Sequence, residues 1–458
     1  MTFPRYPAYK DSGVTWLGEV PEHWEVKRLK QICHVFPSNV DKKSYDGETP
    51  VRLCNYTDVY YNERIVDGME LMAATATTEQ IEKFTLKAGD TIITKDSETA
   101  DDIAIAAYVP EDLPGIICGY HLSMVRPKDQ TCGLFVKRLF DSTYVKSKFE
   151  VLANGLTRVG LGTYALDNVE MPVPPAAEQT AIATFLDRET AKIDALIAEQ
   201  RSLTALLKEK RQAVISHAVT KGLNPKAAMK DSGVAWLGEV PGHWEVSKLK
   251  HFVQFSGGGT PSRDNLLFWN GDIPWVSPKD MKVETIAAAE EYITQAGLEN
   301  SSTNLVPAGR VLMVVRSGIL KHTIPVAINS VTVALNQDMK ALEIDSNRCG
   351  SRFLLLWIQG LNSELLLAWA KQGATVESIE QSYLADTAFP LPSLDEQTAI
   401  VSYLDHQTTQ IDTLITETEK TITLLQERRS ALISAAVTGK MDVRKARWVE
   451  DATFLIAA

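Results

Sequence analysis

The sequence predicts an α+β protein with a pseudo-two-fold internal repeat, in which two similar mixed α/β domains are combined with two long helices. Three observations predict it. A short segment occurs twice, a long amphipathic segment occurs twice, and each pair of copies encloses a different stretch of mixed α/β character. Because self-similarity along a chain usually marks repeated structural units, the order of these segments predicts the domain organisation.

The first copied segment, "KDSGVTWLGEVPEHWEVKRLK", covers residues 10–30 and returns almost unchanged at residues 230–250. Large apolar side chains stand among its polar residues. We expect them to anchor each copy on its own domain or on a partner protein. They are Trp16, Leu17, Trp24, Trp236, Leu237 and Trp244.

The second copied segment, residues 172–220 and 390–438, predicts one long helix in each copy. Apolar residues recur at spacings of three and four, with charged residues between them. Helices of this length cannot bury an apolar stripe alone, and the simplest partner is the other copy. The alternative is two independent helices, each lying on its own domain. The residues expected in the interface are Ile193, Leu196, Leu203, Leu207, Val214, Ile411, Leu414, Leu425 and Leu432.

The inserts between the copies cover roughly residues 31–171 and 251–389. Both contain strand-like runs broken by turn residues, and Gly89 and Gly309 open an apolar run at equivalent places. The inserts are therefore expected to share a fold and to differ in polar detail. A duplicated frame with two different inserts predicts one scaffold that presents two recognition surfaces.

Composition narrows the class of protein. The N-terminus lacks the apolar stretch of a secretory signal, and no apolar run reaches the roughly 18 residues that span a membrane. The five cysteines show no Cys-x-x-Cys spacing, so we expect reduced thiols and a cytoplasmic protein. The net charge of −11 argues against indiscriminate binding to phosphates but is compatible with a local basic groove.

No motif predicts catalysis by this chain. The sequence contains no Walker A loop, no G-x-G-x-x-G fingerprint and no H-E-x-x-H pair. The Gly-rich run at residues 256–262 lacks the lysine of a phosphate loop, so it predicts a flexible loop. We expect His23 and His243 to pack or to form hydrogen bonds rather than to bind a metal. The sequence therefore predicts no catalytic residue, no metal site and no cofactor in this chain.

Three motifs together resemble the specificity subunits of type I DNA restriction-modification systems. They are the copied segment around Trp16, the run "GGGTPSRDNLLFWNGDIPWVSPKDM" that opens the second insert, and the "PxPxxxEQTAIxxxLD" start of each long helix. The first insert departs from the pattern because it lacks the Gly-rich stretch. The resemblance implies a non-catalytic subunit whose two target-recognition domains each recognise one half of an interrupted DNA site. It also implies that the two helices form an antiparallel coiled-coil spacer.

The resemblance further implies partners and domain boundaries. Two modification subunits are expected to bind S-adenosylmethionine and methylate adenine, and restriction subunits to use ATP and Mg²⁺. The expected divisions are residues 1–171 for the first target-recognition domain and 172–222 for the central helix. Residues 223–389 form the second domain, 390–440 the C-terminal helix and 441–458 a tail.

Recognition of base edges needs only a few well-placed groups, such as Arg or Lys for guanine and Asn or Gln for adenine. Loop residues of this kind are the candidates for DNA contact, whereas Trp275 is expected in the core. In the first insert they are Lys42, Lys43, Arg52, Asn55, Tyr56, Lys95, His121, Thr157 and Arg158. In the second they are Thr260, Ser262, Arg263, Lys279, Arg316, Lys321, Gln337, Gln372 and Thr375.

Two other classes of protein remain open at this point. An enzyme with an unrecognised motif would bind S-adenosylmethionine or cleave DNA by itself. A coiled-coil scaffold without a nucleic-acid role would not bind DNA even with its partners present.

Overall fold

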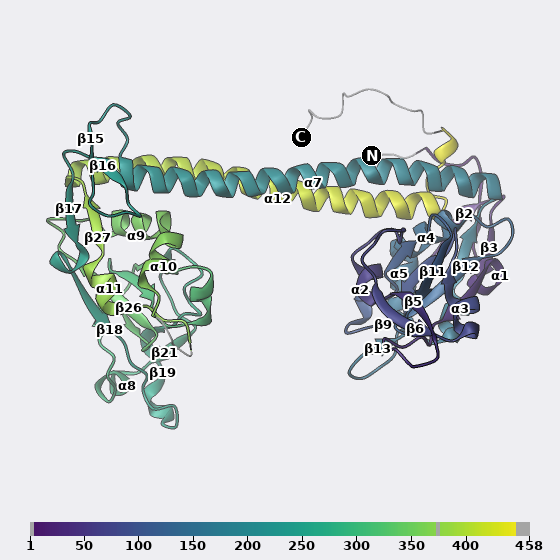
Figure 1. Cartoon of the computed structure of the whole chain (residues 1–458), viewed down its shortest axis with the longest axis horizontal. Helices are drawn as coiled ribbons and strands as arrows, with labels where there is room; N and C mark the ends of the chain where they lie inside the picture. Colours follow the sequence, from purple (N-terminus) through teal and green to yellow (C-terminus); the bar gives the residue numbers. More distant parts are fainter. Residues whose placement is uncertain (1–3, 372–375, 446–458) are drawn as a thin grey trace. The chain divides into compact units, whose positions relative to one another are not determined.

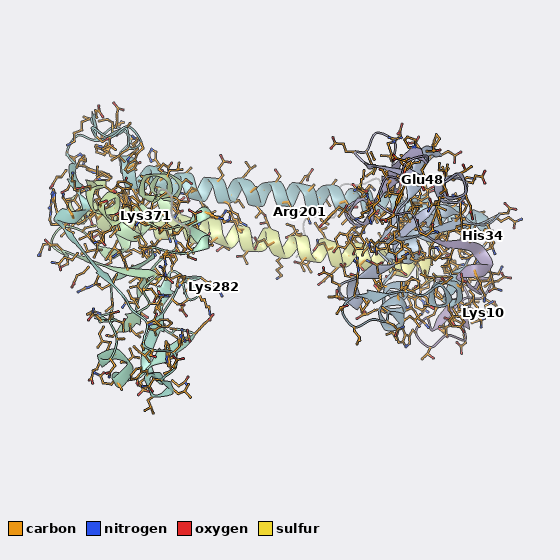
Figure 2. The ribbon with its side chains drawn as sticks, turned by 60° about the horizontal axis from the view of Figure 1, so that its bottom comes forward. Lys10, His34, Glu48, Arg201, Lys282 and Lys371 are labelled. Carbon is orange, nitrogen blue, oxygen red and sulfur yellow. The ribbon has the colours of Figure 1, made fainter. Side chains whose placement is uncertain are left out.

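The computed structural model describes residues 4–371 and 376–445 (Figure 1). The chain forms two compact units: unit 1 is Met1–Gln200 with Lys420–Ala458, and unit 2 is Arg201–Glu419. Two long helices, α7 (Ala176–Lys221) and α12 (Leu394–Val437), each contribute residues to both units. Arg201, where unit 2 begins, lies on α7 (Figure 2). In the described part of the chain, no helix has the length and apolar character needed to cross a membrane.

The insert of unit 1 forms two four-stranded sheets, with strand orders β10-β8-β12-β4 and β6-β5-β11-β7. Both faces of the first sheet are covered, because Ile93 and Ile92 of β8 belong to two different core clusters. The strands are β4 (Cys33–Pro37), β5 (Thr49–Cys54), β6 (Met72–Ala76), β7 (Thr85–Leu86), β8 (Thr91–Thr94), β10 (Ala106–Tyr108), β11 (Leu113–Cys118) and β12 (Leu122–Pro127). The shorter helices are α1 (Leu29–Ile32), α2 (Tyr56–Tyr60), α3 (Thr78–Phe84), α4 (Gly133–Asp141), α5 (Thr143–Leu152) and α6 (Thr163–Asn168).

Unit 2 repeats this arrangement, with strand orders β18-β26-β23-β24-β20 and β21-β19-β25-β22. The added strand β20 runs parallel to β24, where unit 1 has a single parallel bridge between Arg64 and Tyr108. The two inserts therefore share a mixed α/β fold, as predicted. The strands are β18 (Val253–Gly257), β19 (Trp269–Val276), β20 (Thr285–Ile286), β21 (Glu291–Ile293), β22 (Leu305–Val306), β23 (Val311–Val314), β24 (Val326–Asn329), β25 (Val333–Leu335) and β26 (Met339–Ile344). The helices are α8 (Gln295–Glu299), α9 (Ser351–Gly360), α10 (Asn362–Trp369) and α11 (Gln381–Asp386).

Each copied segment forms a small hairpin and a strand that closes its unit. In unit 1, β1 (Tyr9–Asp11) pairs with β2 (Glu19–Pro21), and β3 (Glu25–Arg28) pairs with β14 (Glu170–Val173). In unit 2, the pairs are β15 (Met229–Asp231) with β16 (Glu239–Pro241) and β17 (Glu245–Lys248) with β27 (Ala388–Leu391). The strand that leaves each insert is thus paired with the strand that enters it.

The predicted anchors behave differently in the two copies. Leu17, Trp24, Leu237 and Trp244 are buried in their own units, as expected. Trp236 lies against Trp357, with ring centroids 6.4 Å apart. Trp16 is instead 52% exposed. Burial of the copied segment therefore rests mainly on the second tryptophan and the leucine of each copy.

A glutamate at the start of each long helix binds the copied segment of the same unit. In unit 1, Oε2 of Glu178 lies 2.8 Å from Nε2 of His23, and Oε1 accepts a hydrogen bond from Nε1 of Trp24 at 3.2 Å. In unit 2, Oε2 of Glu396 lies 2.9 Å from Nε2 of His243. The hydrogen-bonding role predicted for the two histidines is confirmed.

The next residue, a buried glutamine, binds the start of a helix in the insert. Oε1 of Gln179 accepts the backbone N–H of Cys132, which precedes α4, at 2.9 Å. Oε1 of Gln397 accepts the backbone N–H of Gly350, which precedes α9, also at 2.9 Å. The N–H groups at a helix start have no partner within the helix, so each glutamine satisfies a group that burial would otherwise penalise. The copied Glu-Gln pair therefore fixes each long helix to two parts of its unit.

The two long helices contact each other within each unit, and the contacts in unit 2 show that they are antiparallel. Oγ1 of Thr204 lies 3.1 Å from Oγ1 of Thr418, and Nε of Arg211 donates to Oδ1 of Asp412 at 2.9 Å. As the residue number rises along α7, from 204 to 211, the number of the contacting residue on α12 falls from 418 to 412. The two helices therefore run in opposite directions. In unit 1, Nε of Arg429 donates to Oδ1 of Asp194.

The predicted interface residues fall into three groups. Ile193, Ile411 and Leu432 are buried, and Leu207, Val214 and Leu425 are half-buried. Leu196, Leu203 and Leu414 are 38%, 42% and 47% exposed, because they lie beside the seam rather than in it. Two buried threonines, Thr204 and Thr418, take places in the seam instead, and their hydroxyl oxygens lie 3.1 Å apart.

Candidate nucleic-acid interface

Four of the predicted DNA-contacting residues of unit 1 gather around one carboxylate, Asp96, just beyond the end of β8. Oδ2 of Asp96 lies 2.8 Å from Nδ1 of His121, and Oδ1 lies 2.6 Å from the guanidinium of Arg158. The guanidinium of Arg158 also lies 5.8 Å from the ring centroid of Tyr56. Lys95 is the neighbour of Asp96 in the chain.

Lys95 is held at the edge of the same cluster. Its Nζ donates to the carbonyl oxygen of Ser38 at 2.9 Å and lies 4.4 Å from the ring centroid of Tyr120. Burial lowers the pKa of Lys95 and raises the pKa of the Tyr56 hydroxyl. Sequence reasoning missed Asp96 and Tyr120, although each is adjacent to a predicted residue. We refer to Tyr56, Lys95, Asp96, Tyr120, His121 and Arg158 as the unit 1 cluster.

The other candidates of unit 1 lie outside this cluster. Lys42 and Lys43 are exposed between β4 and β5, and Thr157 is exposed before β13 (Val159–Gly160). Arg52 donates to Oδ1 of Asp67 at 2.9 Å. Asn55 is buried at the start of α2, where its backbone N–H donates to Asp58. Arg52 of β5 and Asn55 are thus engaged in contacts within unit 1.

Unit 2 places a smaller polar cluster at the equivalent strand ends. Nε of Arg316 donates to Oδ1 of Asp338 at 2.7 Å. Gln337 precedes Asp338 in the chain, and its Oε1 accepts a hydrogen bond from the hydroxyl of Thr260. We refer to Thr260, Arg316, Gln337 and Asp338 as the unit 2 cluster; three of its members were predicted.

Arg263 is engaged elsewhere in unit 2. Both terminal nitrogens of its guanidinium donate to Glu291, and the guanidinium carbon lies 3.9 Å from the ring centroid of Trp269. The hydrogen bond from Arg263 is the main cause that lowers the pKa of Glu291. Trp275 is buried, as predicted, and donates Nε1–H to the carbonyl oxygen of Gly259.

The remaining candidates of unit 2 are dispersed. Ser262 is exposed, and its carbonyl oxygen accepts Nε1–H of Trp269. Lys279 and Lys321 are exposed. Gln372 and Thr375 lie outside the described residues.

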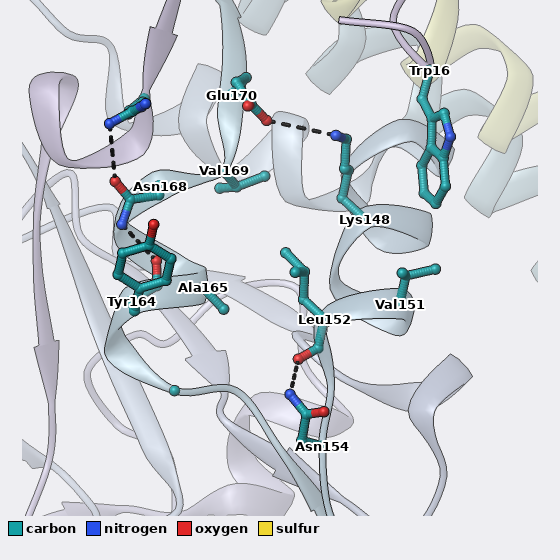
Figure 3. A pocket seen from close by; sticks show the side chains of 12 residues that line it. Trp16, Lys148, Val151, Leu152, Asn154, Tyr164, Ala165, Asn168, Val169 and Glu170 are labelled. Carbon is teal, nitrogen blue, oxygen red and sulfur yellow. Dashed lines mark hydrogen bonds and ion pairs between the residues drawn. The ribbon is translucent and has the colours of Figure 1, made fainter.

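A separate pocket of about 590 Å³ opens in unit 1 beside the exposed Trp16 (Figure 3). Leu152 and Tyr164 line it, together with Lys148, whose Nζ lies 3.6 Å from Oε2 of Glu170. None of the predicted DNA-contacting residues that the structure describes lines this pocket. In residues 4–371 and 376–445, no group of three or more His, Cys, Asp or Glu side chains is arranged to hold a metal ion.

Comparison with known proteins identifies the family. The family model for the type I restriction modification DNA specificity domain matches the sequence of the chain twice, at residues 21–204 and 241–424. The chain belongs to this family. It therefore carries two specificity domains in tandem, which confirms the resemblance inferred from the copied motifs.

Individual type I specificity subunits resemble the chain over different lengths. The EcoR124I/EcoR124II specificity subunit of Escherichia coli is 34% identical over 59% of this chain and 63% of its own length. The putative MjaX specificity subunit of Methanocaldococcus jannaschii is 23% identical over 94% of this chain and 96% of its own length. The chain thus matches less than two thirds of the Escherichia coli protein but nearly all of the archaeal one.

Solved structures share the fold. A chain from a structural study of complex assembly and conformational transition in the type I R-M system superimposes with a TM-score of 0.68 at 19% identity, covering 91% of this chain and 98% of its own. The crystal structure of the HsdS subunit from Thermoanaerobacter tengcongensis gives a TM-score of 0.54 at 18% identity, covering 92% and 98%. These likenesses support the predicted fold class of two mixed α/β domains with long helices.

Proposed function

We propose that this chain is the non-catalytic specificity subunit of a type I restriction-modification complex. Each target-recognition domain recognises one half of an interrupted DNA site. Modification subunits supply S-adenosylmethionine-dependent methylation, and restriction subunits supply ATP-dependent cleavage. The predicted boundaries at residues 171, 222, 389 and 440 are part of this proposal.

The observation that carries the proposal is one backbone fold with two different sets of polar side chains at its strand ends. The unit 1 cluster offers lysine, histidine, arginine and tyrosine, whereas the unit 2 cluster offers threonine, arginine and glutamine. Sequence is recognised by hydrogen bonds to base edges, so different donors and acceptors on equivalent loops select different bases. The net charge of −11 leaves much of the phosphate binding to partner subunits.

The long helices are proposed to set the distance between the half-sites and to bind the modification subunits. Leucines outside the seam are exposed in both units: Leu196 and Leu424 in unit 1, and Leu203, Leu206 and Leu414 in unit 2. Exposed apolar side chains that recur along a helix are typical of surfaces that bind another helix. They are therefore candidates for contact with partner subunits.

An exchange of inserts tests the proposal. Residues 31–171 are replaced by the first insert of another family member, and genomic methylation is sequenced in hosts that express the complete system. We expect one half of the methylated motif to change and the other half to remain. A chain that methylates or cleaves DNA without its partners would contradict the non-catalytic role, and a motif that changes in both halves would contradict independent recognition.

A further inference from the structure

The strand register makes two pairs of residues structurally equivalent. In unit 1, Thr94 of β8 pairs with Leu122 of β12. In unit 2, Val314 of β23 pairs with Met339 of β26. Asp96 lies two residues after the end of β8, and His121 lies one residue before the start of β12. In unit 2, the equivalent positions after β23 and before β26 are Arg316 and Asp338.

The backbone confirms this equivalence without reference to side chains. The N–H of Lys95 donates to the carbonyl oxygen of His121 at 3.1 Å, and the N–H of Val315 donates to the carbonyl oxygen of Asp338 at 2.8 Å. A later segment also closes over both places. Gly160 pairs with Asp96, and Ser378 forms a bridge with Arg316.

Acid and base are exchanged between the two pairs. In unit 1 the position after the first strand holds the acid, Asp96, and the position before the second strand holds the base, His121. In unit 2 the position after the first strand holds the base, Arg316, and the position before the second strand holds the acid, Asp338. In both pairs the carboxylate is the more shielded partner: side-chain exposure is 17% for Asp96 against 30% for His121, and 21% for Asp338 against 55% for Arg316. In each unit, therefore, the basic side chain is the more exposed partner and is paired with a more buried carboxylate.

The number of basic groups also differs. In unit 1, Arg158 provides a second one, 2.6 Å from the same carboxylate. Arg158 lies two residues before Gly160, and the residue two before Ser378 in unit 2 is Val376. Among the described residues at this place, unit 2 therefore presents one guanidinium, whereas unit 1 presents an imidazole and a guanidinium.

The geometry of Arg316 suits recognition of guanine. Its Nε–H is bonded to Asp338, and neither terminal nitrogen has a hydrogen-bond partner among residues 4–371 and 376–445. Two N–H groups on the free edge of a guanidinium match O6 and N7 of guanine in the major groove. Arg263, whose two terminal nitrogens both donate to Glu291, lacks such a free edge.

We propose that Asp338 is a positioning residue that holds Arg316 to recognise a guanine in the half-site of unit 2. Asp96 holds His121 and Arg158 in the same way in unit 1. Because acid and base change places between the units, residues 96 and 121 in unit 1 and residues 316 and 338 in unit 2 are specificity determinants. This inference rests on the proposed function. Holding a long side chain in one rotamer before binding lowers the entropy lost on contact.

The test uses the chain purified with the modification subunits of its system, S-adenosylmethionine and a library of random DNA duplexes, followed by sequencing of the methylated molecules. Arg316→Lys removes the two-pronged donor, and we expect the preference for guanine at one position of one half-site to fall at least about tenfold. Asp338→Asn should lower the same preference by about threefold. The matched change Arg158→Lys should affect only the other half-site.

The exchange variant Arg316→Asp with Asp338→Arg separates specificity from stability. It keeps an ion pair but moves the basic group, so the thermal midpoint of the complex should stay while the preferred base at that position changes. An unaltered guanine preference in this variant, in Asp338→Asn or in Arg316→Lys would overturn the inference while leaving the proposed function intact. A wild-type complex that selects no bipartite motif would overturn both.

Discussion

Nε of Arg429 donates to Oδ1 of Asp194 at 2.9 Å, which joins the two long helices in unit 1. Arg211 and Asp412 occupy the equivalent places in the repeat and make the same bond at the same distance in unit 2. Each arginine also approaches a carboxylate of its own insert. The guanidinium of Arg429 donates to Glu63 at 2.7 Å, and that of Arg211 lies 3.7 Å from Glu284. The repeated arginine therefore connects both helices to the insert in each unit.

Removal of this arginine should destabilise unit 1. Arg429→Ala leaves Asp194 and Glu63 without a shared partner, and we expect the free energy of unfolding to fall by about 1–2 kcal/mol, since both carboxylates are partly exposed. Urea unfolding followed by circular dichroism measures the change. Lys192→Ala is the matched control, because its exposed pair with Glu189 should contribute less than about 0.5 kcal/mol. Equal effects of the two substitutions would contradict the connecting role of Arg429.

The stability of unit 1 should depend on acid through Glu63. Burial alone would raise the pKa of Glu63, but Lys137 and Arg429 outweigh it and lower the pKa from 4.5 to about 2. A carboxylate whose pKa is lower in the folded state stabilises that state above pH 4.5, and this stabilisation is lost as the pH falls toward 2. Glu63→Gln should therefore be less stable than the wild type at neutral pH, with the difference shrinking below pH 4.5.

Unfolding titrations of both proteins between neutral pH and pH 3 measure this difference. A constant gap between wild type and Glu63→Gln across that range would show that Glu63 does not titrate as inferred. Glu199→Gln, at an exposed position of α7, provides a control for the general effect of losing one negative charge.

The architecture was predictable from the sequence because long copied segments leave strong periodic signals. The helix seam was predicted less well. Hydrophobicity alone favoured Leu203 and Leu414, but the helices bury Thr204 and Thr418 and leave those leucines exposed. A two-helix pair covers only one narrow face of each helix, so a shift of one residue moves a side chain out of the seam.

The candidate site shows the same limit. Basic loop residues such as Arg158 and Arg316 were identified by residue type, but Asp96 and Asp338 were not. A carboxylate that holds a basic group has no sequence signature of its own. Its role depends on strand register, which brings residues 96 and 121 together across many intervening positions.

Neighbouring leucines on α7 distinguish the seam from the outer face. Leu207 is half-buried, whereas Leu206 is 60% exposed. Leu207→Asp places a carboxylate against the partner helix and should lower the free energy of unfolding of unit 2 by about 2 kcal/mol. Leu206→Asp should change it by less than about 0.5 kcal/mol but weaken assembly with the modification subunits.

Thermal melting and size-exclusion chromatography with the partner subunits separate these two effects. If Leu206→Asp assembles normally, the outer face of the helices is not the surface that binds the modification subunits. If Leu207→Asp melts like the wild type, Leu207 does not contribute to the helix seam.

The length of the helices should set the gap between the half-sites. Inserting four residues after Gln200 in α7 and four after Ile422 in α12 lengthens both helices by about 6 Å and adds little more than one turn. The apolar spacing of three and four is nearly preserved by such an insertion, so the helix pair should still form. Because a base pair rises about 3.4 Å, the gap in the methylated motif should grow by about one or two nucleotides. Both half-sites should keep their letters, since no strand-end residue has changed, and methylation sequencing in the host reports gap and letters together. An active variant with the original gap would show that some other part of the complex fixes the distance.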